Sequence, residues 1–358
     1  MNAFLRSLTP AQQVAALFLI VFGVLTLISV ATLLVGFRVR RNAQVDQHWQ
    51  RELTDFRKLL RTTWFMAVVF WIGWALGPGF ATFLFGLIAF LALREFITLS
   101  PTRRGDHRSL ILAFFVVLPI QFILVGTARF DLFTVFIPVY VFIAIPVVSA
   151  LANDPSQFLE RNAKLQWGIT VCVYGLSHVP ALLLLEFPGY EGKSAFLVFF
   201  LVFVVQTCMV VQHLIGRRFI YVPPEDRSAQ PDDVGVLSPL HARLQRWLAR
   251  APFAPKVSRS FNWVSWSVGM AIASVVGALM SFITPFKFGQ AMAMALIACV
   301  AGSMGHLVMK ALKRDRGIPN WGPKGVGVTG ANGLLDRVDA LCFSAPIFFH
   351  SVRWYFGV

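Results

Sequence analysis

The stretch from residue 302 to residue 341 gathers the residues of this chain whose types and spacing are best suited to chemistry. Its cations stand at spacings that share one face of a helix, and they are Lys310, Lys313 and Arg314. A glycine-rich run follows, and the stretch ends near the carboxylates Asp336 and Asp339. Cations neutralise phosphate groups, glycines allow close approach of the backbone, and paired carboxylates hold a divalent metal. This is what phosphoryl or nucleotidyl transfer requires, although a basic loop beside a membrane can also be a topological anchor.

The composition of the whole chain places this stretch in a membrane protein. Of the 358 residues, 57% are hydrophobic and 14% are charged, and the mean hydropathy is +0.68. Soluble globular domains of this size do not have such a composition. Helices satisfy their backbone hydrogen bonds internally in lipid. The sequence therefore predicts an all-α polytopic membrane protein with about 9–10 transmembrane helices.

Apolar segments of the length that a bilayer needs recur along the chain. The predicted spans are 13–37, 64–76, 80–93, 109–126, 132–151, 166–185, 194–215, 263–283 and 288–309. The apolar tail 341–356 either spans or lies partly in the membrane. We expect residues 1–62 to form a first transmembrane helix followed by a basic amphipathic segment. Residues 63–358 would form one membrane domain with a polar insertion at 216–261.

The loops between these spans differ sharply in charge. The basic loops are 38–62, 94–108, 152–165, 216–261 and 310–340, and the short, nearly neutral loops are 77–79, 127–131, 186–193 and 284–287. Because basic loops stay on the cytoplasmic side, this alternation predicts that the chemically interesting loops are cytoplasmic. The net charge of +15 is explained by this topology and by anionic lipid. We therefore expect a membrane partner and no nucleic acid.

The stretch 302–341 resembles the signature of the phosphatidate cytidylyltransferases, or CDP-diacylglycerol synthases, in a divergent bacterial branch. That signature runs Gly-Asp-Leu, Ser-x-x-Lys-Arg, Lys-Asp and His-Gly-Gly-x-x-Asp-Arg-x-Asp. The positions that match it in order are Gly305, Leu307, Lys313, Arg314, Gly317, Gly333, Asp336, Arg337 and Asp339. The likeness extends from Trp64 to the C-terminal end. It identifies residues 63–358 as a cytidylyltransferase-like domain in a bacterial inner (plasma) membrane.

The resemblance implies a reaction, its ligands and its site residues. In this family the phosphate of phosphatidic acid attacks the α-phosphorus of CTP, and pyrophosphate leaves. Phosphate groups of CTP and of phosphatidic acid, or of another anionic lipid, would be bound by Lys310, Lys313, Arg314 and Arg337. Asp336 and Asp339 would hold Mg²⁺. A homodimer also fits the family.

Several positions depart from the family pattern. These positions are Met209, Phe261, Val264, His306, Lys310, Pro319, Asn320, Ala331 and Asn332. The family has carboxylates, a lysine, a serine and a His-Gly pair among these positions. A thioether or a phenyl ring cannot replace a carboxylate at a hard cation. His306 is a candidate replacement ligand or proton carrier, and the simpler interpretation is a histidine at the end of a helix.

Two hypotheses for the function follow. The first is an active synthase with a rebuilt site. The second is a catalytically inactive homologue that binds an anionic lipid or a nucleotide, or that regulates a partner in phospholipid synthesis. Under the second, Asp336 and Asp339 would cap the last helix and form internal salt bridges. A transporter is less favoured, because no Asp, Glu, Lys or Arg stands in the centre of a predicted span.

Overall fold

The computed structural model describes residues 9–41, 47–100, 102–187, 190–218, 254, 257–258, 261–318 and 333–357. Every regular element within these ranges is helical. Seven of the described helices are long and apolar enough to cross a membrane. Since helices satisfy their own backbone groups in lipid, the chain is an all-α polytopic membrane protein, which confirms the predicted fold class.

The helices follow one another with few residues between them. In chain order they are α2 (Pro10–Arg41), α3 (Gln47–Ala75), α4 (Pro78–Thr98), α5 (His107–Leu112), α6 (Leu118–Gly126), α7 (Phe130–Val135), α8 (Phe142–Ala150), α9 (Phe158–Gly168), α10 (Leu176–Leu183), α11 (Ala195–Arg218), α13 (Trp263–Leu279), α14 (Phe288–Asp315) and α15 (Leu335–Phe356). Short 3-10 turns are η1 (Arg104–Asp106) and η6 (Met280–Phe282). Seven of the predicted spans coincide, with shifts at their ends, with the seven long apolar helices, whereas 64–76 is the second half of α3 and 166–185 falls on α9, η4 and α10, which are not among those seven.

Three π-helical segments join neighbouring helices into longer rods. They are η2 (Ala113–Val117) between α5 and α6, η3 (Phe136–Val141) between α7 and α8, and η4 (Ile169–Gly175) between α9 and α10. A proline lies inside or shortly after each segment, at Pro119, Pro138 and Pro180. Proline lacks an N–H group and crowds the preceding turn. A wider π turn relieves that crowding without ending the helix.

The first part of the chain differs from expectation in one respect. The basic amphipathic segment and the span 64–76 were predicted as separate elements, but α3 runs through both without a break. The division expected at residue 62 therefore falls inside a helix. Basic residues occupy the first half of α3 and apolar residues the second, so one helix can leave the membrane surface and enter the bilayer. The predicted insertion 216–261 lies mostly outside the described residues.

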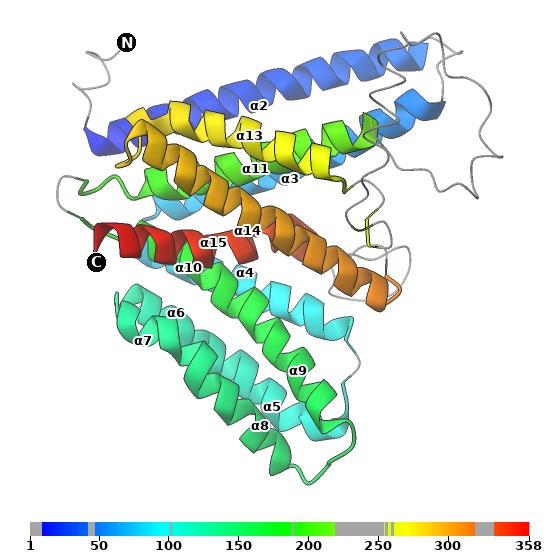
Figure 1. Ribbon diagram of the computed structural model, residues 1–358, viewed down its shortest axis with the longest axis vertical. Coiled ribbons are helices and arrows are strands. Elements are labelled where there is room, and N and C mark those ends of the chain that lie inside the picture. The colour runs from blue at the N-terminus through cyan, green and yellow to red at the C-terminus, as the bar shows by residue number, and fades with distance from the viewer. Residues whose placement is uncertain are drawn as a thin grey trace.

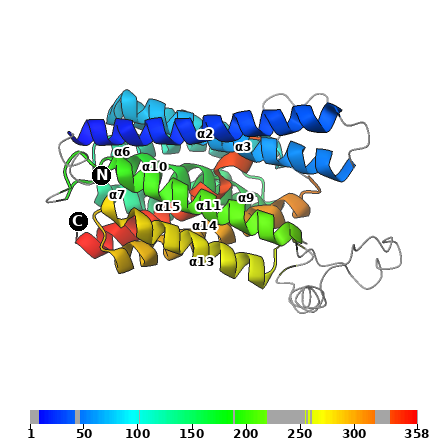
Figure 2. The ribbon, with the colours of Figure 1, turned by 90° about the horizontal axis from the view of Figure 1, so that it is seen from above.

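The helices form a bundle in which α15 is central. Figure 1 shows α15 (red) between α14 and α10, and Figure 2 shows α2 and α3 along one edge of the bundle. Contacts join α15 to α14, α10, η4 and α11, while α13 packs against both α11 and α14. The longest buried side chains belong to this packing, including Phe200, Phe348 and Phe349. The hydrophobic core therefore surrounds the helix that carries the two predicted carboxylates.

The charged helix ends gather on one side of the bundle. We call this side the basic end; it is where α4 and α14 end and where α9 and α15 begin, at the right in Figure 1. It carries Arg94, Arg103, Arg104, Lys313 and Arg314. The C-terminal end of α15 lies at the opposite side. The end of α14 and the start of α15 thus lie at the boundary of the bundle, where polar ligands have access.

Candidate functional site

The last turns of α14 present three of the predicted residues on one helix face. His306, Lys310 and Lys313 follow one another at intervals of four and three residues, which places them along one side of the helix. The helix then ends in a Schellman motif: Gly317 adopts a positive φ of 65°, and the N–H of Ile318 donates to the carbonyl of Lys313 at 3.0 Å. Gly317, one of the matched signature glycines, is therefore explained by the helix end.

The start of α15 is held by a residue that the sequence analysis did not assign to the site, Glu95. Its carboxylate accepts hydrogen bonds from the N–H groups of Gly333 (2.9 Å), Leu334 (2.9 Å) and Leu335 (3.2 Å). Glu95 is 1% exposed and belongs to α4, far away in the sequence. The first N–H groups of a helix have no partner within it, and a negative charge there is favourable. Glu95 thus fixes where α15 begins.

One signal in the sequence could have found Glu95. It is a carboxylate within the last turns of an apolar span, Pro78–Thr98, where a charge is costly unless it has a partner. The pattern does not reveal the partner, because Glu95 contacts backbone groups whose side chains carry no matching charge.

Two acid–base pairs link α14 to α15. Nδ1 of His306 lies 2.6 Å from Oδ2 of Asp339, and Nζ of Lys313 lies 2.6 Å from Oδ1 of Asp336. The two helices run in opposite directions, so the later residue of α14 meets the earlier residue of α15. Asp336 and Asp339 are three residues apart, so both lie on the face of α15 that packs against α14. The structure therefore brings together the predicted His306, Lys313, Asp336 and Asp339.

The pairs are buried, but their cations keep unused donors. Asp339 is 4% exposed and Lys313 is 9% exposed. A buried ion pair is stable only when the geometry compensates the loss of hydration. An ammonium group has three donors, and among the described residues Lys313 bonds only to Asp336, while Lys310 bonds only to Ser258 Oγ at 3.4 Å. Both lysines can therefore donate to a phosphate oxygen while keeping these contacts.

The two predicted arginines lie differently. The guanidinium carbon of Arg337 lies 5.0 Å from the centre of the Phe65 ring in α3, a cation–π contact. Arg337 therefore links α15 to α3 and is oriented by that ring. Arg314 is exposed on the last turn of α14, one residue beyond Lys313. The structure thus places Lys310 and Lys313 in the cluster, with Arg314 at its rim and Arg337 against α3.

Close packing of α14 on α15 depends on a small residue. A Cβ atom at Gly305 would overlap the ring of Phe343 in α15. Gly305 is one of the signature positions, and the residue after it is His306. The absence of a side chain there lets the helices approach until His306 reaches Asp339.

The described donors do not by themselves form a site for Mg²⁺. Within the described ranges no three His, Cys, Asp or Glu residues are grouped so that they could hold a metal ion. Asp336 faces Lys313 and Asp339 faces His306. A hard divalent cation requires several oxygen ligands, and two carboxylates that already face cationic partners do not supply them. The arrangement is one of ion pairs at the basic end.

Two of the substituted family positions, Phe261 and Met209, have apolar surroundings, whereas His306 and Lys310 belong to the polar cluster and Val264 is half-buried. Phe261 is 4% exposed, and Met209 packs against the hydrophobic core. Neither side chain supplies an oxygen donor. The remaining substituted positions Pro319, Asn320, Ala331 and Asn332, together with most of the glycine-rich run, lie outside the described residues.

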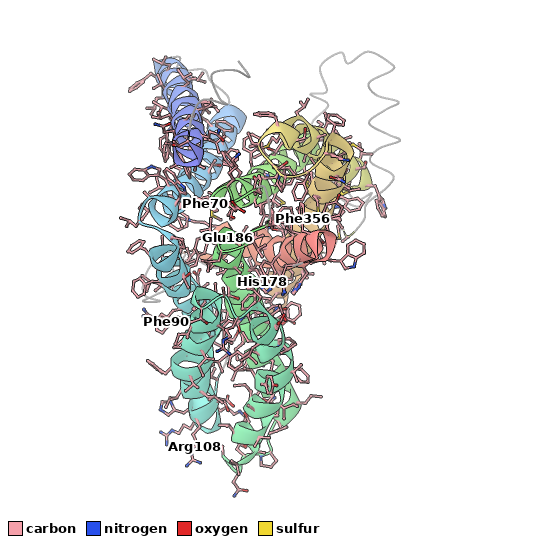
Figure 3. All side chains as sticks on the ribbon, turned by 90° about the vertical axis from the view of Figure 1, so that its left-hand side faces the viewer. Phe70, Phe90, Arg108, His178, Glu186 and Phe356 are labelled. Carbon is pink, nitrogen blue, oxygen red and sulfur yellow. The ribbon has the colours of Figure 1, made fainter. Side chains whose placement is uncertain are left out.

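His178 is a second buried histidine that the site does not use. It is 0% exposed, and its Nδ1 lies 2.7 Å from the carbonyl oxygen of Tyr174. Its ring packs against Phe133 and Phe349, inside the bundle (Figure 3). His178 is therefore a hydrogen-bonded histidine of the core.

The sequence is similar to those of known proteins. The cytidylyltransferase family matches residues 57–220 and 246–355. The uncharacterized protein YnbB of Escherichia coli (strain K12) is 30% identical over 298 residues, which cover 82% of this chain and 86% of that protein. Phosphatidate cytidylyltransferases of Rickettsia bellii (strain RML369-C) and Rickettsia felis (strain ATCC VR-1525 / URRWXCal2) are each 30% identical over 110 and 107 residues. In both cases the match covers 28% of this chain and 46% of the relative.

Proposed function

The chain belongs to the cytidylyltransferase family, and on that premise we propose that it transfers a cytidylyl group from CTP to the phosphate of phosphatidic acid. A phosphate oxygen of the lipid forms a bond to the α-phosphorus of CTP. The bond between that phosphorus and the oxygen bridging to the β-phosphorus breaks, and its electron pair leaves with pyrophosphate. The products are CDP-diacylglycerol and pyrophosphate.

The observation that carries this proposal is the cluster at the meeting of α14 and α15. Lys310 and Lys313 retain unused donors beside two carboxylates, at the end of a membrane bundle. A lipid phosphate at the membrane surface and a nucleotide from solution can both reach such a place. Preorganised cations stabilise the charge that develops on the transferred and departing phosphates.

We assign roles to the residues of the cluster on this basis. Lys310 and Lys313 hold phosphate groups, with Arg314 at the rim as a further contact. Arg337 approaches the lipid phosphate from its position against Phe65. His306 is the candidate proton carrier, because its Nδ1 is fixed by Asp339 and the partner of one ring nitrogen orients the other.

Mg²⁺ remains the cofactor that we propose from the family likeness, with Asp336 and Asp339 as its carboxylate ligands. To bind the ion, these carboxylates must exchange Lys313 and His306 for the metal. When bound, such an ion neutralises phosphate charge. The roles assigned above to Lys310, Arg314 and Arg337 do not depend on it, whereas Asp339 orients His306 only while it is not bound to the ion.

We further propose that the protein resides in a bacterial inner membrane with its basic end in the cytoplasm. The basic end carries Arg94, Arg103, Arg104, Lys313 and Arg314, and such residues are retained on the cytoplasmic side. This orientation gives the cluster access to cytoplasmic CTP.

The direct test is a cytidylyl-transfer assay on the purified protein in detergent. It uses labelled CTP and phosphatidic acid with Mg²⁺, Mn²⁺ or Zn²⁺, and Asp336→Asn as the control. We expect lipid-linked product that is lost in the control. No product with any of the metals, from protein shown to be folded, would refute the enzymatic proposal.

A second candidate function is supported by the pairing of both carboxylates. Because Asp336 and Asp339 face Lys313 and His306, the cluster resembles a neutralised binding site more than a set of metal ligands. An inactive homologue that holds an anionic lipid or a nucleotide would have this arrangement. Retention of labelled phosphatidic acid or CTP without turnover would support this alternative, and any turnover would exclude it.

A further inference from the structure

A second pocket lies at the basic end, separate from the α14–α15 cluster. It has a volume of about 480 Å³ and lies between the end of α4, the turn that follows and η2. Its main lining residues are Arg94, Ile97, Leu99, Ser100, Thr102 and Phe114. None of these residues belongs to α14 or α15. The volume falls within the range of sites that bind small molecules.

Three polar groups of this pocket are hydrogen-bond donors without partners among the described residues, whereas the hydroxyl of the lining residue Thr98 donates to the carbonyl oxygen of Arg94 at 2.7 Å. Among the described residues, none forms a hydrogen bond or ion pair with the guanidinium of Arg94 or with the hydroxyl groups of Ser100 and Thr102. Ser100 is only 6% exposed as a residue, but its hydroxyl oxygen is not among the buried polar atoms without a partner, so a ligand in the pocket can reach it. No carboxylate lines the pocket. A cation and two hydroxyl groups without a competing anion are suited to a phosphate group.

The other half of the pocket is apolar. Phe114, Ile97 and Leu99 line it, and Phe114 packs edge-to-face on Phe90 with ring centroids 5.2 Å apart. Figure 3 shows Phe90 at the edge of the bundle, on the helix that carries the pocket. Hydrocarbon from the bilayer can therefore lie against Phe114 while a polar group reaches Arg94. The pocket is amphipathic in the same sense as a phospholipid.

The surroundings add positive charge. Arg103 and Arg104 are exposed in the segment that follows the pocket. The nearby Asp106 does not neutralise them, since its carboxylate is bound to Arg161 at 2.7 Å. Each basic residue near a membrane surface favours anionic lipid by about 1 kcal/mol. The local field therefore favours an anionic ligand over a zwitterionic one.

We propose that this pocket binds the headgroup of an acidic phospholipid. The phosphate contacts Arg94, Ser100 and Thr102, and an acyl chain lies along Phe114. Arg94 precedes Glu95, which caps α15, and adjacent residues of a helix point in directions about 100° apart. One turn of α4 thus carries the cap of the candidate site on one face and a lipid contact on another. The pocket is a lipid site in addition to any lipid bound at the cluster.

The test locates a bound lipid on the full-length protein without requiring turnover. A phosphatidic acid analogue with a photoactivatable acyl chain is added to the protein in phosphatidylcholine nanodiscs. Mass spectrometry then measures labelling of peptides covering residues 84–120. The test variant is Arg94→Gln, and Arg108→Gln is the matched control, because Arg108 is exposed at the periphery (Figure 3) and does not line the pocket.

We expect Arg94→Gln to lower this labelling about tenfold, as loss of a charge-assisted contact would. Arg108→Gln should change it less than twofold. Unlabelled phosphatidic acid should compete, and added phosphatidylcholine should not. Unchanged labelling in Arg94→Gln would overturn the proposal. Competition by inorganic phosphate at the same concentration would also overturn it, because it would assign the pocket to free phosphate. Asp336→Asn should label like the wild type, so the result does not depend on the proposed enzymatic function.

Discussion

Two ion clusters lie at the basic end, and they are built in different ways. In the first, the buried Arg161 donates hydrogen bonds to Asp106 Oδ1 at 2.7 Å, to Asp154 Oδ2 at 2.8 Å and to the carbonyl oxygen of Ser156 at 2.7 Å. In the second, Lys313 and His306 each meet one carboxylate across the α14–α15 contact. A guanidinium held by several acceptors cannot turn to a ligand without losing them. An ammonium group with one partner can bind a ligand through its other donors and keep that partner.

The comparison separates charged groups that fix the fold from charged groups that we propose to bind phosphate. The Arg161 cluster joins the start of α5 to the start of α9 and to the loop between α8 and α9, so it fixes the fold at that corner. The α14–α15 cluster places unused donors beside carboxylates at the meeting of three helices, since Glu95 of α4 also reaches it. Arg161 also keeps one donor without a partner, Nη2, so the two clusters differ in how many acceptors hold each cation and not in the presence of an unused donor.

We expect the largest effect on the rate of cytidylyl transfer when a cation proposed to bind phosphate is removed. Lys313→Met should lower kcat/KM for cytidylyl transfer by about 100-fold, because a preorganised charge at a transferring phosphate contributes on this scale. Initial rates with labelled CTP measure it. Lys164→Met is the matched control: Lys164 also pairs with a carboxylate, that of Glu160 at 2.5 Å on the same helix, α9, and its loss should change the rate less than twofold. Equal losses in both variants would contradict the distinction between the clusters.

Removing the cap of α15 should have the next largest effect. Glu95→Ala leaves three backbone N–H groups without their acceptor, which costs about 2 kcal/mol or more and loosens the position of Asp336. We expect a lower Tm and a rate reduced about tenfold. Glu95→Gln keeps one acceptor oxygen and should fall between the wild type and Glu95→Ala. If Glu95→Ala kept full activity and stability, Glu95 would not be the residue that positions α15.

The structural cluster should respond in stability and not in chemistry. Arg161→Met leaves Asp106 and Asp154 without their cation, and removing one partner of a buried pair is strongly destabilising. We expect Tm to fall by roughly 5 °C, with kcat at 25 °C within twofold of the wild type. Thermal unfolding and the transfer assay on one preparation measure both. A large loss of kcat in folded protein would place Arg161 in the functional site.

The smallest expected effect is a dependence on pH. The N–H of Ser156, which donates to Asp154 at 3.1 Å, lowers the pKa of Asp154 below its ordinary value of 3.8, and Arg161 acts in the same direction. A lowered pKa in the folded state means that ionised Asp154 stabilises the protein fully above pH 3.8. This contribution is lost as the pH falls through the lowered pKa. The Tm difference between the wild type and Asp154→Asn should therefore shrink in acid, and a difference that grew there would refute this assignment.

The sequence predicted the helices and half of the site. Helical spacing placed Lys310 and Lys313 on one face, the resemblance to the family supplied Asp336 and Asp339, and the structure pairs Lys313 with Asp336. Periodicity does not say which helix a face meets, so the contact of Glu95 with the start of α15 could not be derived. The position of Arg337 on Phe65 depends on α3, whose continuity through residues 47–75 the change from basic to apolar composition concealed.

The most direct test makes the same chemical change in both clusters. Asp336→Asn and Asp106→Asn each replace a carboxylate that faces a buried cation, and CDP-diacylglycerol formation is measured for both in protein shown to be folded. The account predicts a loss of at least about 100-fold for Asp336→Asn, and a rate within about twofold of the wild type for Asp106→Asn despite a lower Tm. Equal activity of Asp336→Asn and the wild type would contradict the central claim that the α14–α15 cluster is the reacting site.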